Sequence, residues 1–416
     1  MAEAAAEGKG FPLSKSAKRA LIIVTACTVT MLALSAGIRQ SLGMFIRPVS
    51  FDLHLGREVI SFAIAMQTLL VGLCAPFSGA IADRFGTVKV ATAGAFFFLI
   101  GLWFTSQAQT PMGLYLSIGL VMGLALTATS MSIMFGAVGR VVQPQYRTIV
   151  FGVVTAGGSL GQFLVIPMVG AVLSSFSWRE SLLVMMAGAI VMIFIAQPLR
   201  IADRAPRKTV SEAASLPQAL REARNHRGFQ LLNASYFVCG FHVSFMATHF
   251  PAFLADRGMD GKTVAIAFAF IGLFNIFGSL FFGYASSRWS KRHVLAWLYG
   301  IRSLIFIPLL FLPMTPALAL GFGAAMGFLY LGTVPPTSGI VAQVFGVRYM
   351  SMMFGIVFLA HQVGGFFGAW IAGYLYDKTG SYEIVWMINI GLGIAATLLV
   401  LPIDDRPIQR KEAVPA

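Results

Sequence analysis

The chain has 416 residues, of which 57% are hydrophobic and only 11% are charged. Soluble proteins carry about 25% charged residues, so this composition excludes an ordinary soluble enzyme and indicates a protein that is solvated by a lipid bilayer. The formal net charge of +14 does not indicate nucleic-acid binding, because most basic residues lie in the termini and loops that flank the apolar segments, as in a membrane protein.

Twelve apolar segments of membrane-spanning length follow one another along the chain, and each can cross a bilayer as a helix. Their approximate bounds are 20–46, 58–82, 88–107, 113–138, 148–173, 180–198, 229–254, 263–287, 292–312, 316–341, 350–375 and 383–402. We therefore predict an all-α membrane protein. The basic N-terminal stretch runs into the first span without a small-residue cleavage site, so we expect no cleavable signal peptide.

The basic residues predict the orientation. With an even number of spans, both termini lie on one side of the membrane, and most of the 30 Lys and Arg residues lie in the termini and loops of that side. The positive-inside rule then predicts cytoplasmic termini. We expect a multi-pass protein of the plasma membrane, specifically a bacterial inner membrane.

The second half of the chain repeats the first. Aligning Gly37 with Gly240, a shift of 203 residues, also places Gly161 on Gly364. A duplicated membrane protein is expected to bind its ligand where the halves meet. The duplication predicts two pseudo-symmetric six-helix bundles, residues 1–198 and 229–416, joined by a cytoplasmic linker at 199–228.

Span 1 contains a charged side chain, Arg39, in apolar surroundings. All 16 Asp and Glu residues fall in loops, termini or helix ends, and a charge at mid-bilayer costs at least about 2.5–3.5 kcal/mol. The natural counter-ion is therefore an anionic substrate, because arginine binds carboxylate in a bidentate fork. The alternative is that Arg39 snorkels toward the outer interface.

The loop between spans 2 and 3 reads Gly-Ala-Ile-Ala-Asp-Arg-Phe-Gly-Thr-Val-Lys at residues 79–89. This segment resembles the loop signature of the major facilitator superfamily of secondary transporters, and residues 283–292 are a degraded copy without the acidic residue. An Asp at a helix end can pair with nearby cations in one conformation and release them in another. We expect a conformational latch formed by Asp83, Arg84, Lys89 and Arg288.

Spans 5 and 6 carry a closer resemblance, to one family within this superfamily. The Arg147 side chain followed by a Gly-rich helix through Gly161, and the Trp178-Arg179 pair, are similar to signatures of the monocarboxylate porter family, and Arg39 stands where that family usually has a lysine. The resemblance implies a twelve-helix transporter that carries monocarboxylates together with protons.

Span 7 carries two histidines, His242 and His249, on one helical face. His242 aligns with Arg39 in the repeat, so we expect it to face Arg39 across a central cavity. Either histidine could bind a carboxylate or carry a proton near neutral pH, and the alternative is a hydrogen-bonded interior histidine. Asn233 and Tyr236 open the same span and could orient a substrate.

Spans 8 and 9 depart from the family pattern. Asn275 and Ser279 occupy the places of the family's Asp and Arg in span 8. Asn275 is nevertheless a candidate for the polar wall of the site. Arg302 lies mid-span in span 9, and either binds substrate or hydrogen-bonds neighbouring carbonyls or span 11.

Spans 10 and 11 supply the remaining polar candidates. Tyr330 aligns with Thr127 of span 4 in the repeat, and both could contact a substrate. Pro335-Pro336 should kink span 10. His361 and Gln362 lie side by side in span 11, a helix expected to flank the cavity, and His361 joins His242 and His249 as a candidate for proton coupling.

The sequence predicts a secondary transporter of small organic anions, foremost monocarboxylates, that works by alternating access with proton symport. An anion exchanger or uniporter, an exporter of neutral amphipathic compounds and a non-transporting sensor remain alternatives. Neither a nucleophile–base pair nor a phosphate loop indicates an enzyme. We expect no cofactor, no metal, no nucleic acid and a monomer in the bilayer. Three cysteines lie inside spans and are interpreted as packing residues: Cys27, Cys74 and Cys239.

Overall fold

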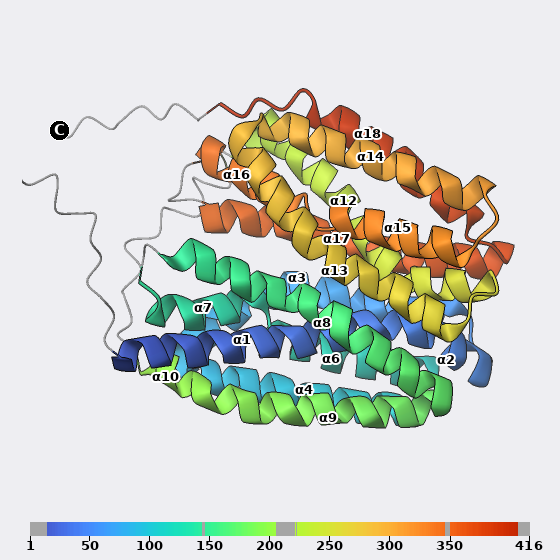
Figure 1. Cartoon of the computed structure of the whole chain (residues 1–416), viewed down its shortest axis with the longest axis horizontal. Helices are drawn as coiled ribbons and strands as arrows, with labels where there is room; N and C mark the ends of the chain where they lie inside the picture. The colour runs from blue at the N-terminus through green and yellow to red at the C-terminus, as the bar shows by residue number, and fades with distance from the viewer. Residues whose placement is uncertain (1–14, 144–145, 205–220, 222, 346–349, 407–416) are drawn as a thin grey trace, which may run out of the picture.

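The structure, a computed structural model, describes residues 15–143, 146–204, 221, 223–345 and 350–406. Within these ranges the chain forms helices and turns, without β-strands (Figure 1). The first half contains α1 (Lys15–Ser41), η1 (Leu42–Phe45), α2 (Ile46–Asp52), α3 (Arg57–Phe85), α4 (Thr87–Gln107), α5 (Pro111–Leu114), the π-helical η2 (Tyr115–Val121), α6 (Met122–Ala128), α7 (Met131–Val141), α8 (Arg147–Ser175), α9 (Trp178–Ala196), η4 (Gln197–Leu199) and α10 (Arg200–Asp203). The second half contains α12 (Arg227–Asp256), α13 (Gly261–Arg288), α14 (Lys291–Phe311), α15 (Pro316–Leu329), α16 (Val334–Phe345), α17 (Met350–Thr379) and α18 (Glu383–Val400).

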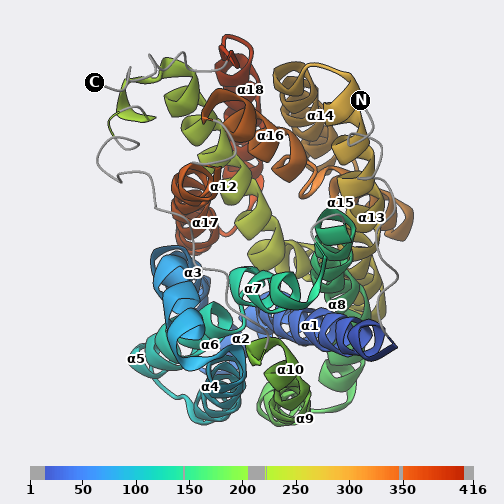
Figure 2. The same ribbon diagram turned by 90° about the vertical axis from the view of Figure 1, so that its left-hand side faces the viewer.

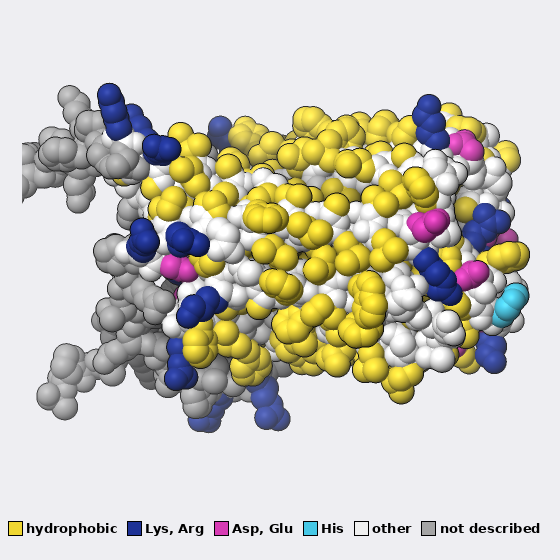
Figure 3. All heavy atoms as spheres, turned by 90° about the horizontal axis from the view of Figure 1, so that it is seen from below, with side chains coloured by type: hydrophobic (Ala, Val, Ile, Leu, Met, Phe, Trp, Pro, Cys, Tyr) yellow, Lys and Arg dark blue, Asp and Glu magenta, His cyan; other side chains and the backbone are white. Residues whose placement is uncertain are grey.

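The twelve predicted spans are confirmed as helical segments long and apolar enough to cross a membrane. Large apolar side chains point outward from them, such as Phe194, Leu280 and Phe311 with 70%, 70% and 77% of their surface exposed. Figure 3 shows these apolar side chains as a broad belt, with the charged side chains gathered toward its two ends. Because exposed apolar surface of this extent is unfavourable in water, the belt is the lipid-facing surface.

The helices of each half of the chain pack mainly on one another. In the first half α1 lies along α8 and α4 along α9, and in the second α12 lies along α17, α13 along α15 and α14 along α18. Figure 2, seen from the end where the termini emerge, shows the two groups one above the other. Gly161 of α8 meets the Ala33 backbone of α1, and its repeat equivalent Gly364 meets the Phe237 backbone of α12. A Cβ at either position would clash, so these glycines let the helices approach closely.

Spans 4 and 10 are interrupted near their middles. Span 4 breaks between α6 and α7, and span 10 breaks between Leu329 and Val334. The predicted interruption at Pro335-Pro336 agrees with this break, because a proline lacks the N–H that would bond the carbonyl four residues earlier and so disrupts the turn before it. Both prolines lie in the first turn of α16, where a helix does not need their missing N–H groups. The break itself lies before them and leaves the carbonyls at the end of α15 without helical partners.

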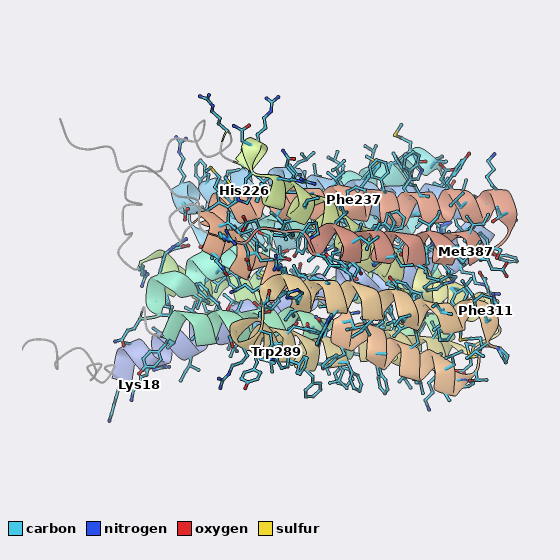
Figure 4. All side chains as sticks on the ribbon, turned by 90° about the horizontal axis from the view of Figure 1, so that it is seen from above. Lys18, His226, Phe237, Trp289, Phe311 and Met387 are labelled. Atoms are coloured by element: carbon cyan, nitrogen blue, oxygen red, sulfur yellow. The ribbon has the colours of Figure 1, made fainter. Side chains whose placement is uncertain are left out.

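The two halves meet along a long contact formed mainly by α3 with α17 and by α8 with α13. We call the end of the molecule from which the termini emerge the terminal end, and the opposite end the far end. In Figure 4, Lys18 and His226 lie toward the terminal end, and Phe311 and Met387 toward the far end. Much of the predicted linker, including residues 205–220, lies outside the described residues, so the boundaries 1–198, 199–228 and 229–416 stay predictions.

Candidate functional site

Arg39 lies between the two halves, near the middle of the first span. Its Nη2 is 3.4 Å from the Thr68 hydroxyl of α3, and its guanidinium also faces the Tyr330 side chain from the break in span 10. Among the described residues, no carboxylate lies within ion-pair distance of Arg39. The side chain is only partly buried. Its contacts are with α3 of its own half and with Tyr330 of the other half, which does not agree with snorkelling toward a headgroup.

Arg302 is fully buried and stabilises the break in span 10. Its Nη2 donates to the carbonyls of Leu329 and, at 3.0 Å, Tyr330, two groups that the end of α15 leaves without helical partners. Its Nη1 lies 3.8 Å from the Cys239 sulfur, while its Nε has no partner among the described atoms. With no exposed surface, Arg302 does not contact a substrate in this conformation, and the carbonyl-binding alternative describes it better.

Asn275 and Tyr330 hold the same break from two sides. Asn275 Oδ1 accepts from the Leu331 N–H at 3.0 Å, and its Nδ2 donates to the Ser159 hydroxyl of α8 at 2.8 Å. The Tyr330 hydroxyl donates to the Val243 carbonyl of α12 at 3.0 Å. Gln40, next to Arg39, also contacts that hydroxyl. Asn275 therefore joins the interruption of the second half to the first half of the protein.

His361 and Gln362 also bridge the halves. His361 Nδ1 is 3.0 Å from Gln362 Oε1, and Gln362 Nε2 donates to the Thr68 carbonyl at 3.0 Å. Because a backbone carbonyl only accepts, the amide nitrogen must face Thr68 and the amide oxygen must face His361. The Tyr236 ring packs on His361 with centroids 4.9 Å apart. Five predicted residues, Arg39, Tyr236, Tyr330, His361 and Gln362, thus lie in one polar cluster at mid-span.

The expectation that His242 faces Arg39 is wrong. Its Nε2 is 3.0 Å from the Asn389 carbonyl of α18, and its ring packs against Phe306 of α14. The ring therefore points into the second half of the protein, away from Arg39. A helix carries side chains all around its axis, so alignment of Arg39 with His242 did not determine which way each side chain points.

His249 belongs to a separate network at the far end. Its Nε2 is 2.8 Å from the Ala369 carbonyl and its Nδ1 is 3.0 Å from the Tyr382 hydroxyl. Tyr382 lies just before α18, and burial raises its pKa above the ordinary value, so the hydroxyl stays protonated and can donate to Nδ1. Both ring nitrogens are then used, which agrees with the interior-histidine alternative rather than with proton transport.

Two candidates lie apart from the polar cluster. Asn233 donates to the Phe229 carbonyl of its own helix, and Thr127 donates to the Gly123 carbonyl of its own helix. Neither has a hydrogen bond to the cluster residues within the described part of the chain.

The structure adds residues that the sequence did not single out. Cys239 lies between Arg302 and the Thr333 hydroxyl, which is 3.1 Å from the sulfur, and Thr68 links Arg39 to Gln362. Cys239 was interpreted as a packing residue because its spacing fits no metal site. The one signal in the sequence was that Cys239 lies three residues before His242, which places the two on the same side of a helix. This spacing is weak evidence, because it does not show which way that side of the helix faces.

At the far end, α3 is tied to the second half through Arg57. The guanidinium donates to both oxygens of Asp256 at 2.6 and 2.8 Å and to the Tyr382 hydroxyl at 3.1 Å. Asp377 at the end of α17 accepts from the N–H groups of Arg57 and Glu58 at 2.9 and 2.8 Å, which caps the N-terminus of α3. These contacts close the far end.

At the terminal end, the predicted latch has different partners. Asp83 pairs with Arg140 of the same half at 3.3 Å, and Arg140 pairs more closely with Asp203 at 2.8 Å. Arg84, Lys89 and Arg288 are exposed. Within the described ranges, no ion pair joins Asp83 to Arg288 or the halves to each other at this end. The structure is therefore closed at the far end and not latched across the halves at the terminal end.

Comparison with known proteins agrees with this architecture. A family model of the Major Facilitator Superfamily matches residues 25–338. An uncharacterized MFS-type transporter of Bacillus subtilis (strain 168), YcxA, is 24% identical over 390 residues, which cover 88% of this chain and 91% of that protein. Monocarboxylate transporter 12-B of Danio rerio is 23% identical over 426 residues, which cover 92% and 86%.

Two solved structures have the same fold. A bacterial homolog of the human lysosomal transporter Spinster, in an inward-facing and occupied conformation, aligns with a TM-score of 0.73 at 17% identity, covering 95% of this chain and 99% of that one. A D-xylose-proton symporter aligns with a TM-score of 0.71 at 12% identity, covering 92% and 97%. The family match extends over most of the chain, and the chain therefore belongs to the major facilitator superfamily of membrane transporters.

Proposed function

We propose that this transporter carries small monocarboxylates across the plasma membrane by alternating access, with proton symport and with both termini in the cytoplasm. One observation carries the substrate class. Arg39 is a partly exposed residue at mid-span whose guanidinium has, among the described residues, a single long hydrogen bond and no carboxylate partner. Since an uncompensated charge in the bilayer costs at least about 2.5–3.5 kcal/mol, an anion that reaches Arg39 from solution gains both charge neutralisation and hydrogen bonds.

The surroundings of Arg39 favour a small anion with one carboxylate. The Tyr330 and Thr68 hydroxyls beside the guanidinium already donate to the Val243 and Ile64 carbonyls, so the donors for one carboxylate are the Arg39 guanidinium and the neighbouring Gln40 amide. The described residues offer no second arginine for a second carboxylate at this position, because Arg302 is buried against backbone carbonyls. The relatives named as monocarboxylate transporters support the same class.

The closed far end supports alternating access as the mechanism. Arg57, Asp256 and Asp377 join the halves there, whereas no ion pair joins the described parts of the halves at the terminal end. Breaking these contacts and forming others at the terminal end would expose Arg39 to the opposite side of the membrane. The predominance of basic residues at the terminal end supports a cytoplasmic location for that end.

The test replaces Arg39 in purified protein and measures binding and uptake of L-lactate and pyruvate in proteoliposomes. Loss of a charged hydrogen-bonding partner costs about 1.5–3 kcal/mol, so Arg39→Gln should weaken binding by about 10- to 100-fold. Arg39→Lys should lose less, because it keeps the charge without the fork. Arg406→Gln, which changes a surface arginine that is 88% exposed, is the control and should bind normally.

Lactamide tests the charge requirement itself. It keeps the size and the hydroxyl of lactate but carries no charge, so the wild-type protein should not bind it. Equal binding of lactate and lactamide, or unchanged lactate binding by Arg39→Gln, would show that the cargo is not recognised as an anion. Equal lactate uptake with and without an inward proton gradient would rule out obligatory symport and leave exchange or uniport.

A further inference from the structure

Cys239 occupies a charged and polar position at the centre of the second half. It is fully buried. Its sulfur lies 3.8 Å from Arg302 Nη1 and 3.1 Å from the Thr333 hydroxyl, and the His361 side chain faces it. An inert packing cysteine would have apolar neighbours. Here a guanidinium, a hydroxyl and an imidazole surround the thiol, which is the kind of environment that stabilises a thiolate.

Arg302 needs a negative partner that the described residues do not otherwise supply. Two backbone carbonyls bind its Nη2, but among the described atoms its Nε has no hydrogen-bond partner and its Nη1 has the Cys239 sulfur as its one hydrogen-bond partner. Among the described residues, no carboxylate lies within ion-pair distance of Arg302. A buried cation without a counter-ion is strongly unfavourable, and a thiolate at Cys239 is the anion that this geometry can provide.

His361 supplies a base next to the same sulfur. Its Nδ1 faces Gln362 Oε1 at 3.0 Å, and since an amide oxygen only accepts, Nδ1 carries the hydrogen. In the neutral ring Nε2 then carries a lone pair. That nitrogen is buried and has no hydrogen-bond partner among the described atoms, in a side chain that is 8% exposed. A buried, unpartnered imidazole nitrogen beside a thiol can share one proton with it.

We infer that Cys239 and His361 form the proton-binding site of this transporter, in place of a carboxylate within the membrane. This inference rests on the proposed function and names the group behind its proton coupling. In the unloaded pair, the sulfur is a thiolate and Nε2 is unprotonated. One proton from solution binds to the pair and resides on either Sγ or Nε2, and no other atom or electron is exchanged.

The charges account for the coupling between proton and anion. Without cargo, the thiolate beside Arg302 is the single negative charge among the described mid-span residues, which hold two cations, Arg39 and Arg302. With cargo, the proton removes that charge and the substrate carboxylate at Arg39 restores it. The net charge of the core is therefore the same in both states. A core of constant charge can change conformation without a new electrostatic cost in the low dielectric of the membrane.

A chain of hydrogen bonds connects the proton site to the anion site. His361 contacts Gln362, Gln362 donates to the Thr68 carbonyl, and the Thr68 hydroxyl is the partner of Arg39. This chain crosses from α17 to α3, the longest contact between the halves. A change of charge at His361 therefore acts on the contact that must change during alternating access.

Other titratable groups around the thiol do not provide a competing site. Three tyrosines that face Cys239 are at most 2% exposed, and each carries a phenolic proton that ionises only far above neutral pH. The groups facing the pair are Tyr236 from α12, Tyr299 and Arg302 from α14, and Tyr330 from the break in span 10, while His242 of α12 faces Arg302. His242 hydrogen-bonds the Asn389 carbonyl instead.

The first test observes the thiol directly and needs no substrate. Infrared spectroscopy of the purified Cys27→Ser, Cys74→Ser double variant reports the S–H stretch of Cys239 alone. The band should disappear as the pH is raised from about 6 to 8, below the ordinary thiol transition near about 8.5. A variant that retains Cys27 alone is the control and should keep its S–H band over this range. An S–H band of Cys239 that persists up to about pH 9 would overturn the inference.

The second test measures proton uptake when L-lactate binds in weakly buffered solution. Wild type should take up about one proton per lactate bound, so lactate affinity should fall about tenfold for each pH unit above the transition. The double variant Cys239→Ser, His361→Gln removes both proton acceptors, because serine keeps a hydroxyl but does not ionise, and it should bind lactate without this proton uptake. Cys27→Ser should behave as wild type. Proton uptake that survives in the double variant would refute the assignment.

The two tests separate the inference from the proposed function. If lactate and pyruvate do not bind to the wild-type protein, the proposed substrate class fails, and the infrared titration still decides whether Cys239 is a thiolate. If lactate binds to wild type without proton uptake, the substrate class stands and the proton site is overturned. Size-exclusion profiles identify any variant that has lost its fold, and the infrared titration of Cys239, which leaves both proton acceptors in place, then decides independently of the double variant.

Discussion

Replacing Asp256 by Asn should open the far end. Arg57 donates two hydrogen bonds to the Asp256 carboxylate at 2.6 and 2.8 Å, and the side chains are only 9% and 23% exposed. Breaking a buried ion pair costs about 3–5 kcal/mol. Because Asp256 is partly exposed and Asn keeps one acceptor, we expect Asp256→Asn to destabilise the closed far end by about 2 kcal/mol. That energy stabilises only the far-closed conformation, so its population should fall about 30-fold relative to the far-open one.

Distances between spin labels measure this shift. Labels at Phe51 and Lys262, which are exposed residues of opposite halves at the far end, should move apart in Asp256→Asn. Asp52→Asn is the matched control, because Asp52 lies at the same end but pairs with Arg179 within the first half. Unchanged distances in Asp256→Asn, or the same change in the control, would show that the Arg57 ion pair does not hold the far end closed.

Two further substitutions test the same reasoning. Asp377→Asn should also favour the far-open conformation, but by about 1 kcal/mol or less, because it weakens a charged helix cap and keeps one acceptor; an effect larger than that of Asp256→Asn would contradict this order. Arg302→Met should lower the melting temperature, because it leaves the carbonyls of Leu329 and Tyr330 without donors at a cost of about 1–3 kcal/mol each. Removing a buried charge offsets part of this cost. An unchanged melting temperature would show that Arg302 does not support the break in span 10.

The fold could be predicted from the sequence because its determinants are local. Span length and hydropathy depend on runs of about 20 residues, and the predicted third span, 88–107, agrees with α4 at Thr87–Gln107. The duplication was equally visible, and the equivalent glycines Gly161 and Gly364 make equivalent close contacts. The membership of the major facilitator superfamily, expected from the loop at residues 79–89, is confirmed.

The site could be predicted only in part, because partners far apart in the chain determine it. The sequence identified Arg39 as a mid-span charge without a resident acid, and the described structure has no such acid beside it. It could not pair Arg57 with Asp256, which are 199 residues apart. Nor could it show that Arg302 binds carbonyls freed by the interruption, because those carbonyls lie 27 and 28 residues further along the chain.

Polar residues at equivalent positions of the two halves differ, whereas the glycines at equivalent positions are the same, and this difference has a physical reason. Gly161 and Gly364 serve packing, which both halves need in the same form. A single anion and a single proton require different chemistry at their binding sites, so one set of polar residues cannot serve twice. In the proposed mechanism the first half supplies the fixed cation, Arg39, and the second supplies the groups that titrate. Placing the two on opposite sides of the contact between α3 and α17 makes each binding event depend on how the halves are arranged, which is what coupled transport requires.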